Sequence, residues 1–307
     1  MGLMYTLGAL PLVQGAGGQD AARSFAESWN RFMLEEVSDA RVWQIPFLGT
    51  EVHLPQWPPI HLGALVIDLS PTKHVMSLLT AAALLAVVMI WTARRTHGKG
   101  AHRAPSGLAN MIEAFVIFLR DEVALRGIGK GGERYVPFVL TLFFFILFMN
   151  FMGLLPFGAT PTGNIAVTAG LAFISLVVIE IGGFLHLGPA GYSKTILVVP
   201  EGLPWFMKVP MGILMAFIEL LAKAARIFAL AIRLFANMLA GHVVIFALIG
   251  LIFLAGMAGG LSRWIGSVAP ALMVVGVMML EILVAFIQAY IFAMLTSVFI
   301  GLVRHPH

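Results

Sequence analysis

The sequence contains no cysteine, and few of its residues are charged. The absence of cysteine among 307 residues excludes disulfides, cysteine-ligated zinc, iron–sulfur centres and thiol catalysis. Only 11% of the residues are charged, against roughly 25% in soluble globular domains. Instead, 60% are hydrophobic and the mean hydropathy is +0.94. The sequence therefore predicts an integral membrane protein with several spans, and a net charge of +4 does not argue for nucleic acid.

The few charges are unevenly placed, and their placement predicts the orientation in the membrane. Residues 1–72 hold seven carboxylates against three arginines, whereas Arg94, Arg95 and Lys99 follow the first apolar run. By the positive-inside rule, the loop after this run is cytoplasmic and the N-terminus lies outside. After five crossings the C-terminus, with Arg304, is expected on the cytoplasmic side.

The apolar runs predict an all-α polytopic membrane protein with about five crossings. They lie at about residues 73–92, 135–155, 164–185, 210–258 and 262–303. At 1.5 Å per residue the last two would be ~70 and ~60 Å long, whereas the hydrocarbon core is ~30 Å thick. Both must be strongly tilted or broken, and glycines between them predict a final hairpin of two long helices.

Other segments are predicted to lie outside the bilayer. We expect a surface helix at 19–40, an extended segment at 41–61, an inner loop with an entering helix at 187–208, and a cytoplasmic surface helix at 106–126. The apolar stripe of the last helix consists of Leu108, Met111, Ile112, Phe115, Phe118 and Leu119.

The chain divides into an N-terminal extension and a membrane domain. Residues 1–64 are assigned to an extracytoplasmic extension and residues 65–307 to the membrane domain. The extension starts like a signal peptide but lacks a basic first part, so a cleaved signal and an interfacial terminus both stay open.

Arg233 is the most costly residue of the apolar tract from 211 to 258. A guanidinium stays charged, and placing it in hydrocarbon costs ~2.5–3.5 kcal/mol. Asn237 and small residues share its helical face, which allows another helix to approach closely. Glu219 and Glu281 are turns away from it, so we expect the carboxylate that pairs with Arg233 to belong to another chain.

A histidine and a carboxylate are expected to meet within the hairpin. Glu281 and Gln288 are seven residues apart and share a face, which an antiparallel arrangement can bring to His242. Such a pair can pick up and pass protons, and a purely structural pair is the alternative. For Glu180 a structural role stays open, and Arg226 can simply snorkel to the interface.

The run from Arg233 to His242, RLFANMLAGH, resembles the signature of subunit a of F-type ATP synthase. The resemblance continues in Ile67-Asp68, in the segments 149–156 and 161–164, and in the spacings of Glu219 and Glu281; it covers about residues 65–303. One departure is an exchange: many bacterial members carry the acid where His242 stands and the histidine where Glu281 stands. Residues 1–64 contribute nothing to the resemblance.

The resemblance implies a stator beside a rotating ring of c subunits, with two proton half-channels. Arg233 would be the essential ring-facing arginine, and the chain itself would be non-catalytic, without cofactor or metal. The other positions implied to lie on the proton path are Asn237, His242, Glu281, Gln288, Glu219 and Asp68. The implied partners are the c-ring, subunit b of the peripheral stalk, the soluble ATPase sector and the lipid of a bacterial plasma (inner) membrane.

Two other classes of membrane protein are alternatives to a stator. A proton-coupled secondary transporter would also use intramembrane charges, but it should show internal repeats, which are not visible. A membrane hydrolase would need a nucleophile or metal cluster, and the sequence has neither HExxH nor GxSxG. The pair His242 and Glu281, with no further oxygen ligands, favours H⁺ over Na⁺ as the ion.

Overall fold

The computed structural model describes most of the chain, and helices dominate it. It covers residues 18–39, 42–44, 51–58, 60–62, 65–67, 70–97, 107–155, 160–196, 204–257 and 261–304. In chain order the elements are α2 (Gly18–Val37), β1 (Val42–Gln44), β2 (Glu51–His53), β3 (Ile60–Leu62), β4 (Leu65–Ile67), α3 (Lys73–His97), α4 (Leu108–Phe118), η2 (Leu119–Leu125), α5 (Arg126–Ile128), η3 (Gly132–Tyr135), α6 (Val136–Leu154), η4 (Pro161–Gly163), α7 (Ile165–Ile196), α8 (Trp205–Met257) and α9 (Leu261–Arg304).

The predicted all-α polytopic fold is confirmed. Among the described residues, five helical segments are long and apolar enough to cross a membrane: Lys73–Arg95, Gly132–Leu154, Ile165–Pro189, Pro210–Gly256 and Gly266–Arg304. Their positions agree with the five apolar runs of the sequence. The four strands have only three residues each and precede the first of these helices.

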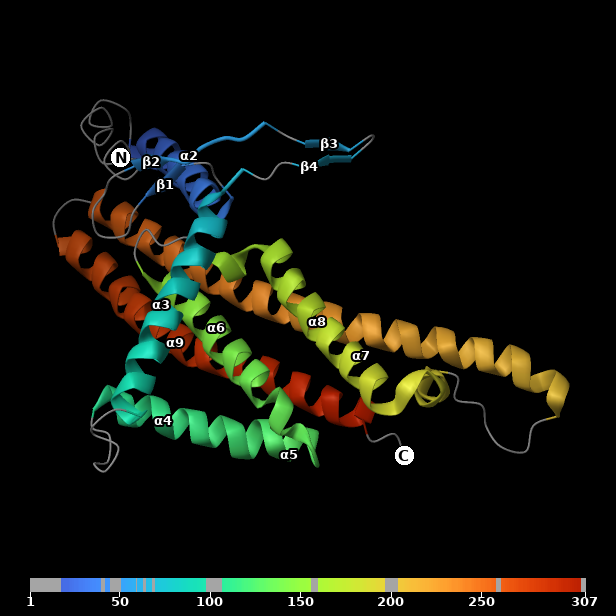
Figure 1. The fold of residues 1–307 in the computed structure, drawn as a ribbon. Coiled ribbons are helices and arrows are strands. Elements are labelled where there is room, and N and C mark those ends of the chain that lie inside the picture. The colour runs from blue at the N-terminus through green and yellow to red at the C-terminus, as the bar shows by residue number, and fades with distance from the viewer. Residues whose placement is uncertain are drawn as a thin grey trace. The chain divides into compact units, whose positions relative to one another are not determined.

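The last two helices are long and unbroken. Figure 1 shows α8 and α9 as continuous ribbons, and they contain 53 and 44 residues. Since neither is broken, each must be strongly tilted to remain within a hydrocarbon core ~30 Å thick. Pro210 and Pro270 lie inside α8 and α9 but do not break these helices.

One predicted boundary is wrong. The inner loop expected from residue 187 is still helical, because α7 continues to Ile196. Gly188 interrupts the helix with φ 68° and ψ 173°, and Pro189 follows it. The range of α7 therefore consists of two helical segments joined at a kink, and Pro189 is tolerated because it lies at the first turn of the second segment.

The surface helix is confirmed, but its apolar stripe is only partly buried. Ile112 and Leu119 are buried, whereas Leu108, Met111 and Phe118 are 53%, 50% and 45% exposed. The three exposed residues lie in α4, and the chain continues from Leu119 to Leu125 as the π-helix η2.

The N-terminal segments have the predicted types. The helix expected at 19–40 is α2, and the extended segment expected at 41–61 contains one antiparallel hairpin and the start of a second, whose strand β4 lies beyond residue 61. In the first hairpin Trp43 pairs with Val52, and in the second His61 pairs with Val66.

The chain forms two compact units, and four of the helices contribute to both. The first comprises Met1–Ala82, Phe148–Asn164 and Phe235–Phe286, and the second Ala83–Leu147, Ile165–Leu234 and Ile287–His307. In each unit α8 and α9 run antiparallel. In the first unit His242 meets Glu281, and in the second the Arg226 guanidinium lies 5.2 Å from the Phe299 ring centroid.

The first unit fixes α2 to α8 through one tryptophan. Trp29 is 5% exposed, and its indole Nε1 donates a hydrogen bond of 3.0 Å to the carbonyl oxygen of Phe246. Its ring lies 5.5 Å from that of Phe253, centroid to centroid. Gly250 makes room for this contact, because a Cβ there would overlap the Trp29 side chain. The amphipathic helix is therefore docked rather than free on the surface.

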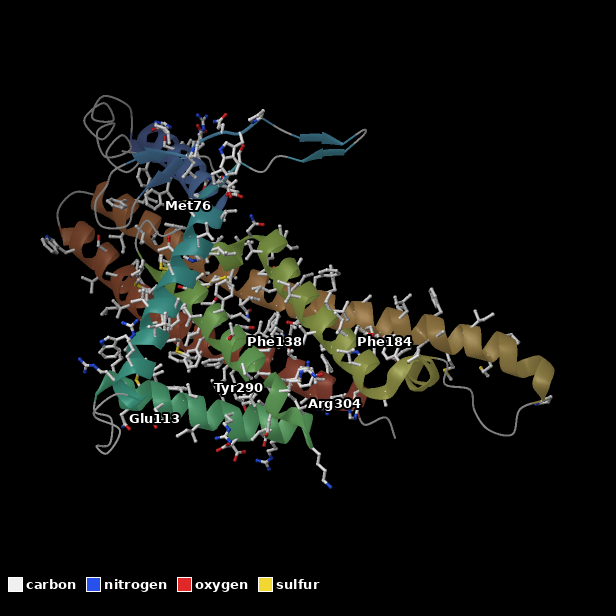
Figure 2. The ribbon with its side chains drawn as sticks, in the orientation of Figure 1. Met76, Glu113, Phe138, Phe184, Tyr290 and Arg304 are labelled. Atoms are coloured by element: carbon white, nitrogen blue, oxygen red, sulfur yellow. The ribbon has the colours of Figure 1, made fainter. Side chains whose placement is uncertain are left out.

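The second unit secures the end of α9 against the turn before α6. Arg304 donates a 2.9 Å hydrogen bond to the Gly131 carbonyl, and its guanidinium lies 5.5 Å from the Tyr135 ring centroid. Tyr290 of the same helix stacks on Phe118, with centroids 6.2 Å apart; Figure 2 labels Arg304 and Tyr290. The C-terminal helix thus packs on the surface helix.

Candidate functional site

The hairpin brings His242 and Glu281 together, as the sequence predicted. Nε2 of His242 lies 4.0 Å from Oε1 of Glu281, and the two side chains are 16% and 5% exposed. Neither carboxylate oxygen of Glu281 has a hydrogen-bond partner among the described residues. A buried carboxylate with an imidazole 4.0 Å away is suited to accept and release a proton.

The close approach of Glu281 depends on the residue before the histidine. A Cβ added at Gly241 would lie 2.5 Å from Oε1 of Glu281. Any side chain at this position of α8 would therefore displace the carboxylate. Packing within this chain therefore explains why the RLFANMLAGH run has a glycine at position 241.

Thr160 is a member of the site that the sequence analysis missed. Its hydroxyl lies 2.7 Å from Nε2 of His242, and the residue is 8% exposed. A Cβ at Gly153 would lie 2.6 Å from the Thr160 hydroxyl and from Cε of Met238. The glycine at this position therefore provides the space that Thr160 occupies.

A buried amide holds the end of α6 against α9, one turn after Glu281. Asn150 is 1% exposed and donates a 3.4 Å hydrogen bond to the carbonyl of Ala285. It also accepts a 2.9 Å hydrogen bond from the hydroxyl of Thr162. The segments 149–156 and 161–164, which carried part of the family resemblance, meet through these residues.

Arg233 and Asn237 lie one turn apart on α8, and both are exposed. Arg233 forms no ion pair with any residue in the part of the chain that the structure describes. Residues on the other side of the helix are buried: Leu230, Ala231, Leu234, Met238 and Ile245. The face that carries Arg233 is therefore turned away from the chain, and it also exposes Ala229, Ala236 and Ala240.

Gln288 is 7% exposed and Glu281 4% exposed, so the predicted common face of α9 is an inward face. They are two helical turns apart on α9, the former in the second unit and the latter in the first. Asp68 lies outside the described residues.

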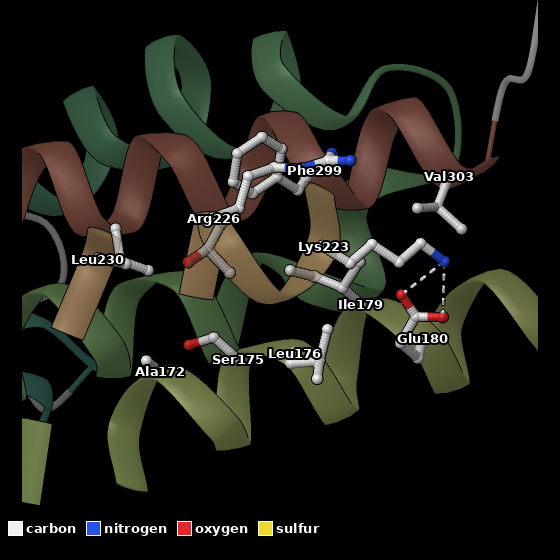
Figure 3. A pocket seen from close by; sticks show the side chains of 11 residues that line it. Ala172, Ser175, Leu176, Ile179, Glu180, Lys223, Arg226, Leu230, Phe299 and Val303 are labelled. Atoms are coloured by element: carbon white, nitrogen blue, oxygen red, sulfur yellow. Dashed lines mark hydrogen bonds and ion pairs between the residues drawn. The ribbon is translucent and has the colours of Figure 1, made fainter. Parts of the chain in front are cut away.

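The second unit contains two ion pairs on α8, one turn apart. Glu219 accepts a 3.2 Å hydrogen bond from Arg226 on the same helix. Lys223 reaches across to α7, where its Nζ lies 2.9 Å from Oε1 and 3.1 Å from Oε2 of Glu180 (Figure 3). Both basic side chains are therefore paired, so Arg226, for which simple snorkelling was the alternative, has a carboxylate partner within the chain.

These charges border two pockets in the second unit. A cavity of about 30 Å³ is lined by Glu180, Lys223, Arg226 and Thr296 among others (Figure 3). A larger pocket of about 280 Å³ is lined by Glu180, Glu219 and Lys223. A water molecule needs roughly 10–15 Å³ measured this way, so both pockets have room for water beside the carboxylates.

The residues found together do not form a metal site. Within the described part of the chain, no three histidine or acidic side chains cluster in a way that could hold a metal ion. The chemistry that these side chains offer is proton binding and charge pairing.

Comparison with known proteins identifies the family. The family model described as ATP synthase A chain matches residues 74–301. Among curated relatives, ATP synthase subunit a of Anaeromyxobacter dehalogenans (strain 2CP-C) is 40% identical over 304 residues, covering 94% of this chain and 73% of the relative. ATP synthase subunit a of Myxococcus xanthus (strain DK1622) is 45% identical over 244 residues, covering 77% of this chain and 73% of the relative.

The relatives extend the likeness beyond the expected range. ATP synthase subunit a 2 of Chlorobaculum tepidum is 40% identical over 290 residues, covering 94% of this chain and 76% of the relative. Coverage of 94% necessarily includes much of residues 1–64, which contributed nothing to the resemblance in the sequence. The chain therefore belongs to the ATP synthase A chain family, as a multi-pass membrane component of F-type ATP synthase.

Proposed function

We propose that this chain is the stator subunit that conducts protons past a rotating c-ring and couples their flow to ATP synthesis. The observation that carries the proposal is the exposed, unpaired position of Arg233 among the described residues. A charge of this kind in a membrane helix needs a partner. A carboxylate on a neighbouring ring, approaching over the small residues around Arg233, would supply one.

The polar residues on either side of this position would form two half-channels. Asn237, His242, Glu281 and Gln288 would carry protons from the outside to the ring, with Asp68 near the mouth. Glu219, paired with Arg226 beside a pocket, would belong to the path that leads to the cytoplasm. Arg233 would separate the two paths by holding the ring carboxylate ionised as it passes.

The energetic role follows from the charge that is moved. Each proton that crosses ~100 mV supplies ~2.3 kcal/mol, which the ring would convert into torque. The chain would itself be non-catalytic, since nucleotide chemistry would belong to the soluble ATPase sector, held by subunit b. We further propose a bacterial inner-membrane location, with residues 1–64 outside, residues 65–307 as the membrane domain and the C-terminus in the cytoplasm.

The test is the conservative substitution Arg233→Lys in the intact complex. Lysine keeps the charge but loses the planar, permanently charged guanidinium, so we expect proton-driven ATP synthesis in membrane vesicles to be abolished. Arg126→Lys, at a side chain that is 76% exposed, is the matched control and should couple normally. Wild-type coupling in R233K would refute the proposal. A subunit that purifies without a ring and soluble sector would favour a transporter.

A further inference from the structure

A second pair of titratable side chains, Asp39 and His74, lies in the first unit. Asp39 follows α2, and its side chain is 34% exposed. His74, at the start of α3, is 3% exposed. Nε2 of His74 lies 3.9 Å from Oδ1 of Asp39. One member of the pair thus reaches the surface and the other is inside the protein.

One of the two ring nitrogens of His74 makes no hydrogen bond with the described residues. Nδ1 is buried and has no hydrogen-bond partner among the described residues. Asp39 faces the imidazole from the end of α2, Lys73 adjoins it on α3, and the backbone of Thr160 forms a hydrogen bond with it. A buried polar atom without a partner is uncommon in native proteins and needs a reason.

Thr160 connects this pair with the pair described above. Its backbone adjoins His74, and its hydroxyl lies 2.7 Å from Nε2 of His242. His242 in turn lies 4.0 Å from Glu281. The order Asp39, His74, Thr160, His242, Glu281 leads from a partly exposed carboxylate to a buried one, and all five residues belong to the first unit.

We propose that Asp39 and His74 are the outermost members of a proton relay that loads the His242–Glu281 pair from the aqueous side. The inference rests on the function proposed above and extends its outer half-channel beyond the residues assigned there. Asp39 accepts a proton from water and His74 accepts it at Nε2. His74 then releases a proton from Nδ1 towards the Thr160 hydroxyl, directly or through one water.

The transfer is balanced at every step. Each group that gains a proton gives one up in the next step, so no further reactant is required. The Thr160 oxygen takes up one proton and passes its own to Nε2 of His242. The imidazolium of His242 then returns to neutral by giving the proton on this same nitrogen to Oε1 of Glu281, 4.0 Å away. In this arrangement α2 delivers the collecting carboxylate to a site formed by α3, α8 and α9.

The competing explanation is a structural clasp. Asn164, just before α7, donates a 3.3 Å hydrogen bond to Oδ2 of Asp39, so Asp39 also ties α2 to the segment before α7. A clasp requires the hydrogen bond, whereas a relay requires side chains that bind protons. Asp39→Asn separates the two, because asparagine can still accept the hydrogen bond from Asn164 but cannot take up a proton.

The experiment measures passive proton conduction through the assembled complex in membrane vesicles stripped of the soluble sector. We expect D39N and H74Q to lower conduction about tenfold or more, the scale of a lost acid–base group, with unchanged assembly. D39E should restore conduction. N164A, which removes the clasp and leaves both titratable groups, should conduct like the wild type.

The possible failures are distinguishable. Wild-type conduction in H74Q would overturn the relay. A loss in N164A as large as that in D39N, or failed assembly of both D39N and H74Q, would overturn it in favour of the clasp. R233K is assayed in parallel: if it couples normally the proposed function fails, whereas loss of coupling in R233K with normal H74Q rejects the relay alone.

Discussion

Gly241 sets how closely the carboxylate of Glu281 approaches α8 in the first unit. The added Cβ of an alanine would lie 2.5 Å from Oε1 of Glu281, closer than any real contact. Because the carboxylate is the end of a flexible side chain, it would move away from the added Cβ. The proton-binding atom would then lose its position relative to His242.

We therefore expect Gly241→Ala to lower proton conduction roughly 10- to 100-fold, since a displacement of about 1 Å has effects of this size at reacting groups. Gly256→Ala is the matched control on the same helix, because no atom lies within 4 Å of a Cβ there. Passive conduction in stripped vesicles checks both variants. Equal conduction in G241A and G256A would show that Glu281 needs no such space.

Residues joined by helical periodicity were the ones that sequence could predict. The meeting of His242 with Glu281 followed from antiparallel geometry, and the buried face shared with Gln288 followed from a seven-residue spacing. Thr160 and His242 are 82 residues apart in the sequence, and Thr160 lies directly before the short turn η4, so no helical periodicity indicates their contact. The same holds for Asp39, which is 125 residues from Asn164 in sequence.

The docking of α2 depends on how whole helices pack on one another. The sequence predicted a surface helix from its mixed charges, but it could not reveal that Trp29 packs on α8. Likewise, the π-helical turn of η2 and the helical segment of α7 after Gly188 were not predicted from the sequence. Helix types and spans were predictable, whereas their attachments were not.

Truncation of Trp29 should release α2. Burial of an aromatic side chain contributes about 3–5 kcal/mol, so Trp29→Ala should expose residues 18–37 to protease added from outside. Trp29→Phe, which keeps most of the ring packing and loses one hydrogen bond, should be cut much more slowly. Trp57→Ala is the control, since that side chain is 57% exposed. Equal cleavage of W29A and W57A would contradict the docking.

The pair of Lys223 and Glu180 should hold α7 to α8 in the second unit. Glu180→Gln leaves an ammonium that is only 16% exposed without a carboxylate, and we expect a loss of about 1–3 kcal/mol in stability. Glu122→Gln breaks a pair that is 52% and 76% exposed and should have little effect. Thermal release of the subunit from the purified complex measures both. A smaller loss of thermal stability in E180Q than in E122Q would refute the stabilising role of the Lys223–Glu180 pair.

At the scale of the whole molecule, the described surface is one that only a membrane or a partner can cover. Large apolar side chains on α8 and α9 are mostly outward, for instance Phe217 at 62% and Met279 at 70% exposure. The face of α8 around Arg233 differs from these, because it exposes small residues. Lipid does not require small side chains, but a helix packed at close distance does.

Enlarging this small face should block assembly without disturbing the fold. The double substitution A236L/A240L adds volume only where both side chains are exposed, so the subunit should insert normally but fail to co-purify with a ring. Gly276→Leu on α9, where no atom lies within 4 Å of a Cβ, is the control and should co-purify. Normal co-purification of A236L/A240L would place the ring elsewhere.

The hydrogen bond between Trp29 and Phe246 also limits when α2 can dock during synthesis of the chain. Its partners are separated by 217 residues, so α2 is synthesised long before the part of α8 that receives it exists. At about 5–20 residues per second this interval is roughly 10–40 s. The N-terminal helix must therefore wait, with its aromatic face uncovered, until most of the chain has been made. The docking of α2 is therefore among the last tertiary contacts that the chain can form.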